Sequence, residues 1–373
     1  MSKAAAAATV AAGAEDLVAL SRRLHAHPET AWEEHRAAGW VGEILAAAGF
    51  AMTRRYLGLD TALLASAGSG PYRVGLCAEY DALPGLGHAC GHNLIAATAV
   101  GAALALAPLA DDLGLTVELY GTPAEEGGGG KIEMLNRGAF TGLDLAMMAH
   151  PAPVDVAEAR PFAVSHSHVT YRGRAAHAAA YPEHGVNAAD AFTVAQVAIG
   201  LLRQQLPPGV RVHGVLTRGG EAPNAIPERT EGRWYVRAET LADLAALEPR
   251  IRRCFEAGAL ATGCELEITP ESEPYSEFRT DERALAAYRH NAEALGRRFA
   301  DGATAARMNR ASTDMGNVSL VVPAIHPYVG IGSLPALNHQ REFAAHCVGG
   351  TAERAMLDAA TALAWTAMDM VLA

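Results

Sequence analysis

The chain has 373 residues, of which 50% are hydrophobic and 19% are charged, and its formal net charge is −11. This length predicts two domains, and the composition is typical of a globular protein that buries a large core. The acidic balance argues against nucleic acid or an anionic membrane as a partner, because both attract clustered Lys and Arg side chains.

The chain begins with an alanine-rich segment, Met1 to Ala14, that lacks the apolar stretch of a signal peptide, so we expect a frayed lead-in to the first helix. The longest apolar run, Leu94 to Leu109, is shorter than the ~18 residues that a membrane span requires. Five irregularly spaced cysteines cannot all pair within one chain, which favours a reduced, cytoplasmic compartment. These are Cys77, Cys90, Cys254, Cys264 and Cys347.

The first half of the chain alternates helices and strands. Residues 16–48 have apolar positions at helical spacing, interrupted at the His27-Pro28 step. Strands are then expected at 73–77, 115–120 and 143–148, and helices at 93–106 and 131–137. This alternation predicts an α/β domain with a mixed, mostly parallel sheet flanked by helices.

The pattern changes near Phe162, where residues 164–171 alternate as a half-exposed antiparallel strand does. The order strand, helix, strand, strand, helix, strand predicts an inserted α+β sandwich of ferredoxin-like topology. Its expected elements are strands 164–171, 210–216, 230–238 and 265–269 and helices 187–205 and 241–258. We therefore expect an inserted domain at 163–272 and a discontinuous catalytic domain at 1–162 and 273–373, ending in a helix at 351–371.

Side chains that bind metals follow three predicted strands of the catalytic domain. They are His88, Cys90 and His92 in a glycine-rich turn, then Glu125 and Glu126, then His150. Ligands of open α/β sheets bind beyond the carboxyl ends of the strands, so these three groups can converge at one edge. Imidazole, thiolate and carboxylate groups are all ligands of zinc-like ions.

Each group alone has an ordinary interpretation: a tight turn with an incidental thiol, a solvated acidic turn, and a core histidine. Their occurrence at three successive strand ends favours a metal site, in which Glu126 holds the ion and Glu125 accepts a proton from the attacking water. Two rival functions stay open. One is a cysteine hydrolase that uses Cys90 with His92 or His150, and the other is a non-catalytic small-molecule binding protein on the same fold.

Six segments together resemble one known family. They are Glu79–Asn93 (EYDALPGLGHACGHN), Pro123–Lys131 (PAEEGGGGK), Ala149–Pro151, Gly173–Pro182 (GRAAHAAAYP), Gly219–Pro227 (GGEAPNAIP) and Ser312–Ser319 (STDMGNVS). In this order, over nearly the whole chain, they are similar to the aminoacylase/carboxypeptidase family of dinuclear metallopeptidases. The chain looks most like its amidohydrolase branch, which includes hippurate hydrolase, auxin-conjugate hydrolases, aminobenzoyl-glutamate hydrolase and β-alanyl-dipeptide hydrolases. The resemblance implies a zinc-peptidase-like catalytic domain and an inserted lid and dimerisation domain.

The resemblance also implies roles for individual residues. The implied metal ligands are Cys90, at or near a bridging position, with His92, Glu126, His150 and His339. Glu125 matches the general base.

Four further residues have implied roles outside the ligand set. His177 of the inserted domain matches a histidine that reaches the site of a partner subunit and steadies the oxyanion. Asn224 matches a residue near the substrate carboxylate. Asp81 and His88 are expected to orient ligands rather than to bind the metal.

Some positions depart from the common family pattern. Asn93 stands where many members have Asp, and Glu79 replaces an Asp, as in the branch that acts on dipeptides and aminobenzoyl-glutamate. His339 is followed by Gln340-Arg341 rather than by a Ser/Thr-Pro step, which leaves His326 as the alternative C-terminal ligand.

The expected function is the hydrolysis of the amide bond of an N-acyl or N-aminoacyl amino acid, or of a dipeptide, by metal-activated water. Two divalent ions are expected, zinc or manganese, with cobalt or nickel as alternatives. The expected partners are this small substrate and a second copy of the chain, in a homodimer formed through the inserted domain. Arg310 is either a contact for the substrate carboxylate or a surface arginine.

Overall fold

The computed structural model describes residues 2–300 and 311–372 and divides the chain into two compact units. Unit 1 comprises Met1–Pro161 and Phe278–Ala373, and unit 2 comprises Phe162–Glu277. The sequence placed the end of the insertion at 272. The role of unit 2 as a lid and dimerisation domain stays a prediction.

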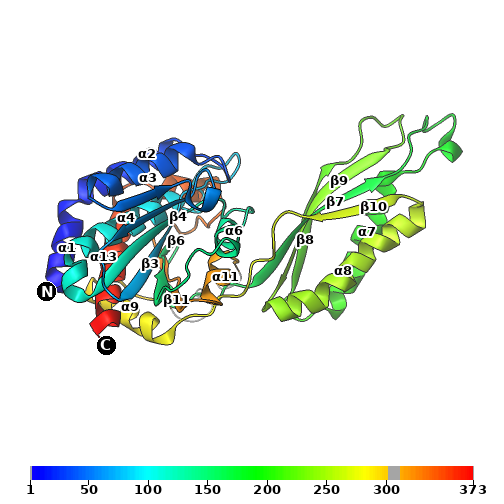
Figure 1. Cartoon of the computed structure of the whole chain (residues 1–373). Coiled ribbons are helices and arrows are strands. Elements are labelled where there is room, and N and C mark those ends of the chain that lie inside the picture. Colours follow the sequence, from blue (N-terminus) through cyan, green and yellow to red (C-terminus); the bar gives the residue numbers. More distant parts are fainter. Residues whose placement is uncertain (1, 301–310, 373) are drawn as a thin grey trace. The chain divides into compact units, whose positions relative to one another are not determined.

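Unit 1 is built on a six-stranded mixed sheet of order β1-β2-β4-β3-β5-β11 (Figure 1). Its strands are β1 (Ala51–Arg54), β2 (Leu63–Ala67), β3 (Tyr72–Glu79), β4 (Leu115–Thr122), β5 (Leu145–Met147) and β11 (Ala324–Ile325). The pairs β3/β4, β3/β5 and β5/β11 are parallel, whereas β1/β2 and β2/β4 are antiparallel. A second, parallel pair joins β6 (His150–Ala152) to β12 (Tyr328–Gly330). The predicted mixed, mostly parallel sheet is confirmed.

Helices cover both faces of this sheet, as alternating side chains along its strands show. Leu76 and Leu119 point into a core with the helix α4 (His92–Leu106) and the helix α13 (Gly350–Leu372). Their neighbours Cys77 and Tyr120 point into a second core with Met134 and Met315. Because successive strand residues face opposite sides, near-continuous apolar strands are what a sheet covered on both faces requires.

The remaining helices of unit 1 include an ordered N-terminal helix. Their bounds are α1 (Lys3–Ala12), α2 (Ala14–Ala26), α3 (His35–Ala47), α5 (Ala110–Leu113), α6 (Gly130–Asn136), α9 (Glu282–Ala294), α11 (Met315–Ser319) and α12 (Arg341–His346), with 3-10 turns η1 (Tyr56–Gly58) and η2 (Ala107–Leu109). The expected frayed lead-in is wrong, because Ala6 and Val10 are buried and Lys3 Nζ lies 2.7 Å from Asp369 Oδ2 of α13.

Two helical segments are long and apolar enough to cross a membrane: His92–Leu113, which runs from α4 to α5, and Gly350–Leu372. The bent pair α1 and α2 would add a third if it were counted as one span. In the fold, 83% and 67% of the two apolar windows are buried. Packing within the core of unit 1 therefore accounts for their composition.

Unit 2 has the predicted ferredoxin-like order. Its elements are β7 (Ala163–Arg172), η3 (Pro182–His184), α7 (Ala188–Leu202), η4 (Arg203–Gln205), β8 (Arg211–Arg218), β9 (Arg229–Ala238), α8 (Leu241–Thr262) and β10 (Glu265–Pro270). The antiparallel sheet has the order β10-β7-β9-β8, and both helices pack on one face through a core that includes Tyr171, Phe192 and Trp234.

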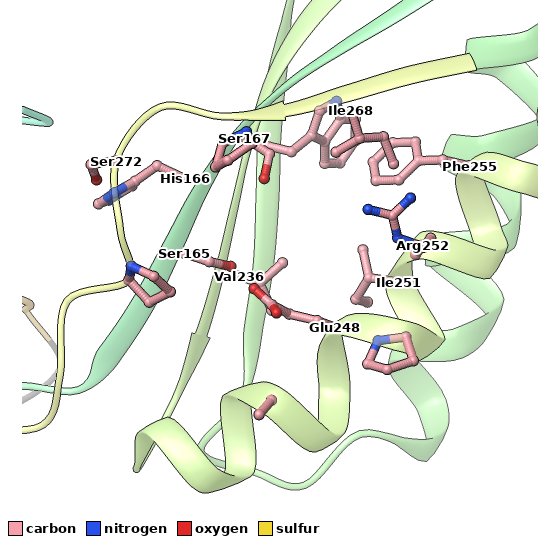
Figure 2. A pocket seen from close by; sticks show the side chains of 15 residues that line it. Ser165, His166, Ser167, Val236, Glu248, Ile251, Arg252, Phe255, Ile268 and Ser272 are labelled. Atoms are coloured by element: carbon pink, nitrogen blue, oxygen red, sulfur yellow. The ribbon is translucent and has the colours of Figure 1, made fainter. Parts of the chain in front are cut away.

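A pocket of about 440 Å³ lies between α8 and this sheet (Figure 2). Its floor is apolar, with Ile251 and Phe255, and Glu248 and Arg252 of α8 line it as well. None of its lining residues belongs to the predicted metal site.

Candidate metal centre

A tight turn at the carboxyl end of β3 positions the first two predicted ligands. Gly91 has a φ of 82° and precedes α4, so that His92 is the first residue of the helix. A Cβ on Gly91 would lie 2.9 Å from the side chain of Pro151, which leaves room only for glycine. Cys90 and His92 are thereby held on either side of one glycine, and both are buried.

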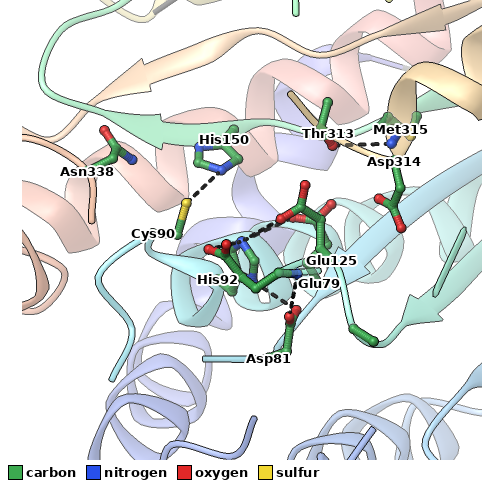
Figure 3. Close-up of polar contacts among 12 residues, drawn as sticks. Glu79, Asp81, Cys90, His92, Glu125, His150, Thr313, Asp314, Met315 and Asn338 are labelled. Atoms are coloured by element: carbon green, nitrogen blue, oxygen red, sulfur yellow. Dashed lines mark hydrogen bonds and ion pairs between the residues drawn. The ribbon is translucent and has the colours of Figure 1, made fainter. Parts of the chain in front are cut away.

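Asp81 orients both His92 and the loop after β4. Its Oδ1 lies 3.0 Å from Nδ1 of His92, and its Oδ2 accepts the backbone N–H of Glu126 at 2.9 Å (Figure 3). Because Nδ1 donates to the carboxylate, Nε2 of His92 keeps its lone pair for a metal. Asp81 therefore occupies the orienting position that the sequence predicted.

Two further histidines approach the sulfur of Cys90. Nε2 of His150 and Nε2 of His339 each lie 3.5 Å from Sγ of Cys90. His150 bonds through Nδ1 to the carbonyl oxygen of Pro151 at 2.8 Å, which leaves its Nε2 as the ligating atom. His339 has a φ of 68°, and its backbone N–H donates to the carbonyl oxygen of Ala89, the neighbour of Cys90.

The five predicted ligands converge. Their donor atoms form three groups within 4.8 Å: Cys90 with His92 and His150, Cys90 with Glu126 and His339, and His92 with Glu125 and Glu126. Among the described residues, the buried atoms His92 Nε2 and Glu126 Oε1 have no hydrogen-bond partner. A divalent cation satisfies both atoms, so these side chains fit a metal site. Cys90 belongs to two of the groups.

A second cluster of buried charges adjoins this centre. Lys131 Nζ lies 2.6 Å from Glu79 Oε1 and 2.7 Å from Asp314 Oδ1, and all three side chains are fully buried. Glu79, Asp314 and Glu125 bring carboxylate oxygens within 4.8 Å of one another. The sequence pattern gave Glu79 no role and missed Lys131 and Asp314, because a lone Lys or Asp in a turn is usually solvated.

Burial controls the ionisation of the central groups. Burial, and then the charges of Glu79 and Glu126, raise the pKa of Glu125 well above its usual range. Burial, and then the charge of His326, lower the pKa of His150 to about 3, so its ring is neutral, as a metal ligand must be. Burial and the charge of Glu126 raise the pKa of the Cys90 thiol, whereas a nucleophilic cysteine requires a lowered pKa.

Two predicted or alternative histidines lie outside the three ligand groups. His88 is buried beside His25, and burial lowers its pKa to about 3. His326 stacks on His150 with ring centroids 5.5 Å apart. Among the described residues, the ligand groups therefore include His339 and not His326.

The predicted residues of the inserted domain lie side by side in unit 2. His177 forms a β-bridge with Ala225, and the backbone N–H of Ala178 donates to the carbonyl oxygen of Asn224 at 3.0 Å. The side chains of His177 and Asn224 are exposed. Arg310 lies outside the described residues.

Comparisons with known proteins find several relatives of this chain. A model of Peptidase family M20/M25/M40 matches residues 75–360. The chain is 42% identical over 373 residues to the Xaa-Arg dipeptidase of Mus musculus, covering 96% of this chain and 86% of the relative. It is 35% identical over 257 residues to one subunit of the p-aminobenzoyl-glutamate hydrolase of Escherichia coli, covering 63% of this chain and 53% of that protein.

Among solved structures, the fold is similar to that of the YXEP protein of Bacillus subtilis, described as a dinuclear metal-binding peptidase of the M20 family. The TM-score is 0.70 at 22% identity, over 97% of this chain and 99% of the other.

Proposed function

Because the chain belongs to peptidase family M20/M25/M40, and is therefore a metal-dependent hydrolase of peptide or amide bonds, we propose a specific mechanism for it. Two divalent ions bind at the ligand groups that share Cys90, and Glu125 serves as the general base. The observation that carries this proposal is the convergence of Cys90, His92, Glu126, His150 and His339, with Glu125 beside them.

His92 and His150 hold one ion together with Cys90, and Glu126 and His339 hold the other. Divalent ions in such a site supply Lewis acidity and make water acidic enough to lose a proton near neutral pH. Glu125 accepts that proton and delivers it to the departing amine. Its raised pKa suits both steps, because a more basic carboxylate accepts a proton more readily than an ordinary glutamate does.

We propose that His177 and Asn224 of unit 2 act on the substrate. Nδ1 of His177 accepts the backbone N–H of Ala179 and of Ala180, at 3.3 and 3.1 Å. A neutral ring with Nδ1 as acceptor carries its proton on Nε2, which then donates to the oxyanion. Asn224 is proposed to bind the substrate carboxylate.

We propose that His177 acts in the site of a partner subunit, within a homodimer formed through unit 2. Exposed apolar side chains of unit 2 support this assembly: Val197 and Leu201 of α7 and Val215 of the edge strand β8 are each more than half exposed. Mixing inactive His177→Ala protein with inactive Glu125→Ala protein should restore activity, because mixed dimers contain one intact site. No recovery after subunit exchange would show that His177 acts within its own chain or not at all.

The proposed substrates are dipeptides and N-acyl amino acids, with dipeptides ending in Arg tested first. The support is the 42% identity to a relative named Xaa-Arg dipeptidase. Zinc or manganese is the proposed metal, with cobalt or nickel as alternatives, since His, Cys and Glu ligands admit all four. A cytoplasmic location is proposed because all five cysteines are free thiols.

The test of the base is Glu125→Ala, with Glu133→Gln on the nearby helix α6 as the matched control. Metal content of Glu125→Ala should equal that of the wild type while turnover collapses, and Glu133→Gln should keep both. Turnover of Glu125→Ala within about tenfold of wild type would exclude Glu125 as the base.

Two rival functions, a cysteine hydrolase and a non-catalytic binding protein, are separated by chelation and by hydrolysis assays with dipeptides and N-acyl amino acids. A cysteine hydrolase would keep its activity after chelation of the metal, whereas the proposed metal enzyme would lose it. A non-catalytic binding protein would hold two ions per chain and hydrolyse none of the dipeptides or N-acyl amino acids offered.

A further inference from the structure

Two non-glycine residues of unit 1 have left-handed backbones and share one hydrogen-bond acceptor. The φ angle is 68° at Trp32 and 57° at Ala124. Both backbone N–H groups donate to Oε1 of Glu34, at 3.0 Å from Trp32 and 2.8 Å from Ala124. L-amino acids with side chains adopt this conformation only at a steric cost. One carboxylate therefore stabilises two strained turns that are 92 positions apart in the sequence (124 − 32).

Glu34 is fully buried, which is an expensive place for a carboxylate. Burial, and then the charge of Asp81, raise its pKa to about 7. Hydrogen bonds from Thr61 and from Ala124 act in the opposite direction. A buried acid of this kind is tolerated where its hydrogen bonds fix the position of other groups.

The loop that Glu34 stabilises carries the proposed base. Ala124 directly precedes Glu125, and its carbonyl oxygen accepts the N–H of Gly128 at 3.1 Å. On the other side of Glu125, the N–H of Glu126 donates to Asp81 at 2.9 Å. Two buried carboxylates thus hold the backbone N–H groups of the residues on either side of Glu125.

The turn at Trp32 and the turn at Ala124 are also in close steric contact. A Cβ on Gly128 would lie 2.6 Å from Cβ of Ala124 and 2.7 Å from Nε1 of Trp32. The turn at Trp32 therefore limits the space into which the turn at Ala124 can move. A change at Glu34 is expected to reach Glu125 through this contact as well as through the hydrogen bond.

We propose that Glu34 is a positioning residue for Glu125: it holds Ala124 in the left-handed conformation that directs Glu125 and Glu126 to different partners. Glu125 lies near Glu79 and Asp314, whereas Glu126 lies near Cys90 and His339. The inference rests on the proposed role of Glu125 as the base.

The test compares Glu34→Ala with Glu34→Gln, whose carbonyl oxygen can still accept both N–H groups. We expect kcat to fall about ten- to hundredfold in Glu34→Ala, with KM and metal content within threefold of wild type. Glu34→Gln should keep kcat within about threefold, as a rescue by the conservative variant. An equal loss in both variants, or none in Glu34→Ala, overturns the proposal.

Ala124→Gly supplies a second, independent readout. Glycine adopts a positive φ without the steric cost, so Ala124→Gly should restore kcat about tenfold in the Glu34→Ala background. Should Glu34→Ala alone fail to fold, recovery of folded, active protein in the double variant supports the proposal, and no recovery overturns it.

Glu29 provides the matched control for stability. Its carboxylate accepts the N–H groups of Arg36 and Ala37 at the start of α3, at 3.0 and 2.9 Å. Glu29→Ala should lower the melting temperature while kcat stays within about twofold of wild type. A loss of kcat in Glu29→Ala as large as that in Glu34→Ala would assign the effect to general destabilisation and overturn the proposal.

Amide hydrogen exchange of a peptide covering residues 123–130 tests the same idea without activity. Exchange should rise at least tenfold in Glu34→Ala and stay at the wild-type rate in Glu34→Gln. Unchanged exchange in Glu34→Ala overturns the proposal whatever the kinetics show. If the wild type hydrolysed no substrate while exchange changed as expected, the proposed function would fail and the positioning of the loop would stand.

Discussion

Lys131→Met is the substitution whose effect the structure defines most sharply. The chain has two lysines, and Lys131 is the fully buried one, 2.6 Å from Glu79 and 2.7 Å from Asp314. Methionine has a similar length and fills the space, so that the main change is the loss of one positive charge between two buried carboxylates. Removing one partner of a buried pair costs about 3–5 kcal/mol, because the other charge is left uncompensated.

The pH dependence of this loss follows from the pKa of Glu79. Burial opposes ionisation of Glu79, but the charges of Lys131, His92 and His150 together outweigh it and lower the pKa to about 2 from the ordinary 4.5. In the wild type this stabilisation is present above about pH 4.5 and is lost as the pH falls towards 2. In Lys131→Met the carboxylates lack their cation, so the folded variant takes up protons more readily than the unfolded chain. The free energy of unfolding of Lys131→Met should therefore fall furthest below that of the wild type near pH 7.5, and the difference should shrink towards pH 5.

The assay is urea unfolding of metal-loaded protein, followed by circular dichroism at pH 7.5 and 5. Lys3→Met is the matched control, because Lys3 and its partner Asp369 each have side chains 33% exposed, and such a pair contributes about 0–1 kcal/mol. The triple variant Lys131→Met, Glu79→Gln, Asp314→Asn should recover most of the stability. A deficit below about 1 kcal/mol at pH 7.5, or one that does not change with pH, would refute this reasoning.

Three further predictions concern other residues. Asp81→Ala should weaken metal affinity about 10–100-fold, because His92 loses its orienting carboxylate; competition with a chelator measures this, and an unchanged affinity contradicts it. Elemental analysis should find one bound ion in His339→Ala and two in His326→Ala. The reverse pattern would make His326 the C-terminal metal ligand in place of His339. Burial, and then the charge of Arg237, lower the pKa of His166 to about 4. Because the unfolded chain binds this proton at the ordinary pKa of 6.5, the free energy of unfolding should fall by up to about 3 kcal/mol as the pH falls from about 6.5 to 4. Unfolding midpoints of His166→Phe should depend less on pH over that range, and an identical dependence would exclude His166 as the source.

The strand-end argument predicted four ligands because their positions follow from topology alone. β4, β3 and β5 are parallel neighbours, so the turns that follow them share one edge. An apolar run of about four to eight residues is enough to locate such a strand in the sequence. His339 follows no such strand. It reaches the site through a loop whose backbone bonds to Ala89, and the resemblance to a known family was the only signal for it.

Among the elements that were not predicted are three very short strands. β11 has two residues, and β6 and β12 have three each. A period of two cannot be recognised in so few positions, and these strands exist because a neighbouring strand supplies their hydrogen bonds. The antiparallel edge strand β1 is mostly exposed, with the pattern of a loop. Its assignment depends on β2, which lies beside it in the sheet.

Three glutamates within six residues show why the roles of single carboxylates could not be predicted. Glu29 caps α3, the side chain of Glu33 is 75% exposed, and Glu34 is fully buried against Ala124. All three stand in the same polar turn, and no local pattern separates them. Glu34 differs from the other two because its partner Ala124 lies ninety positions away in the sequence. Glu125 and Glu126 pose the same problem: adjacent side chains diverge in a loop, and which one meets the metal depends on Asp81 and Glu34. For this centre, ligand type can be predicted from local sequence, but the assignment of roles to neighbouring carboxylates requires the tertiary contacts that fix the backbone between them.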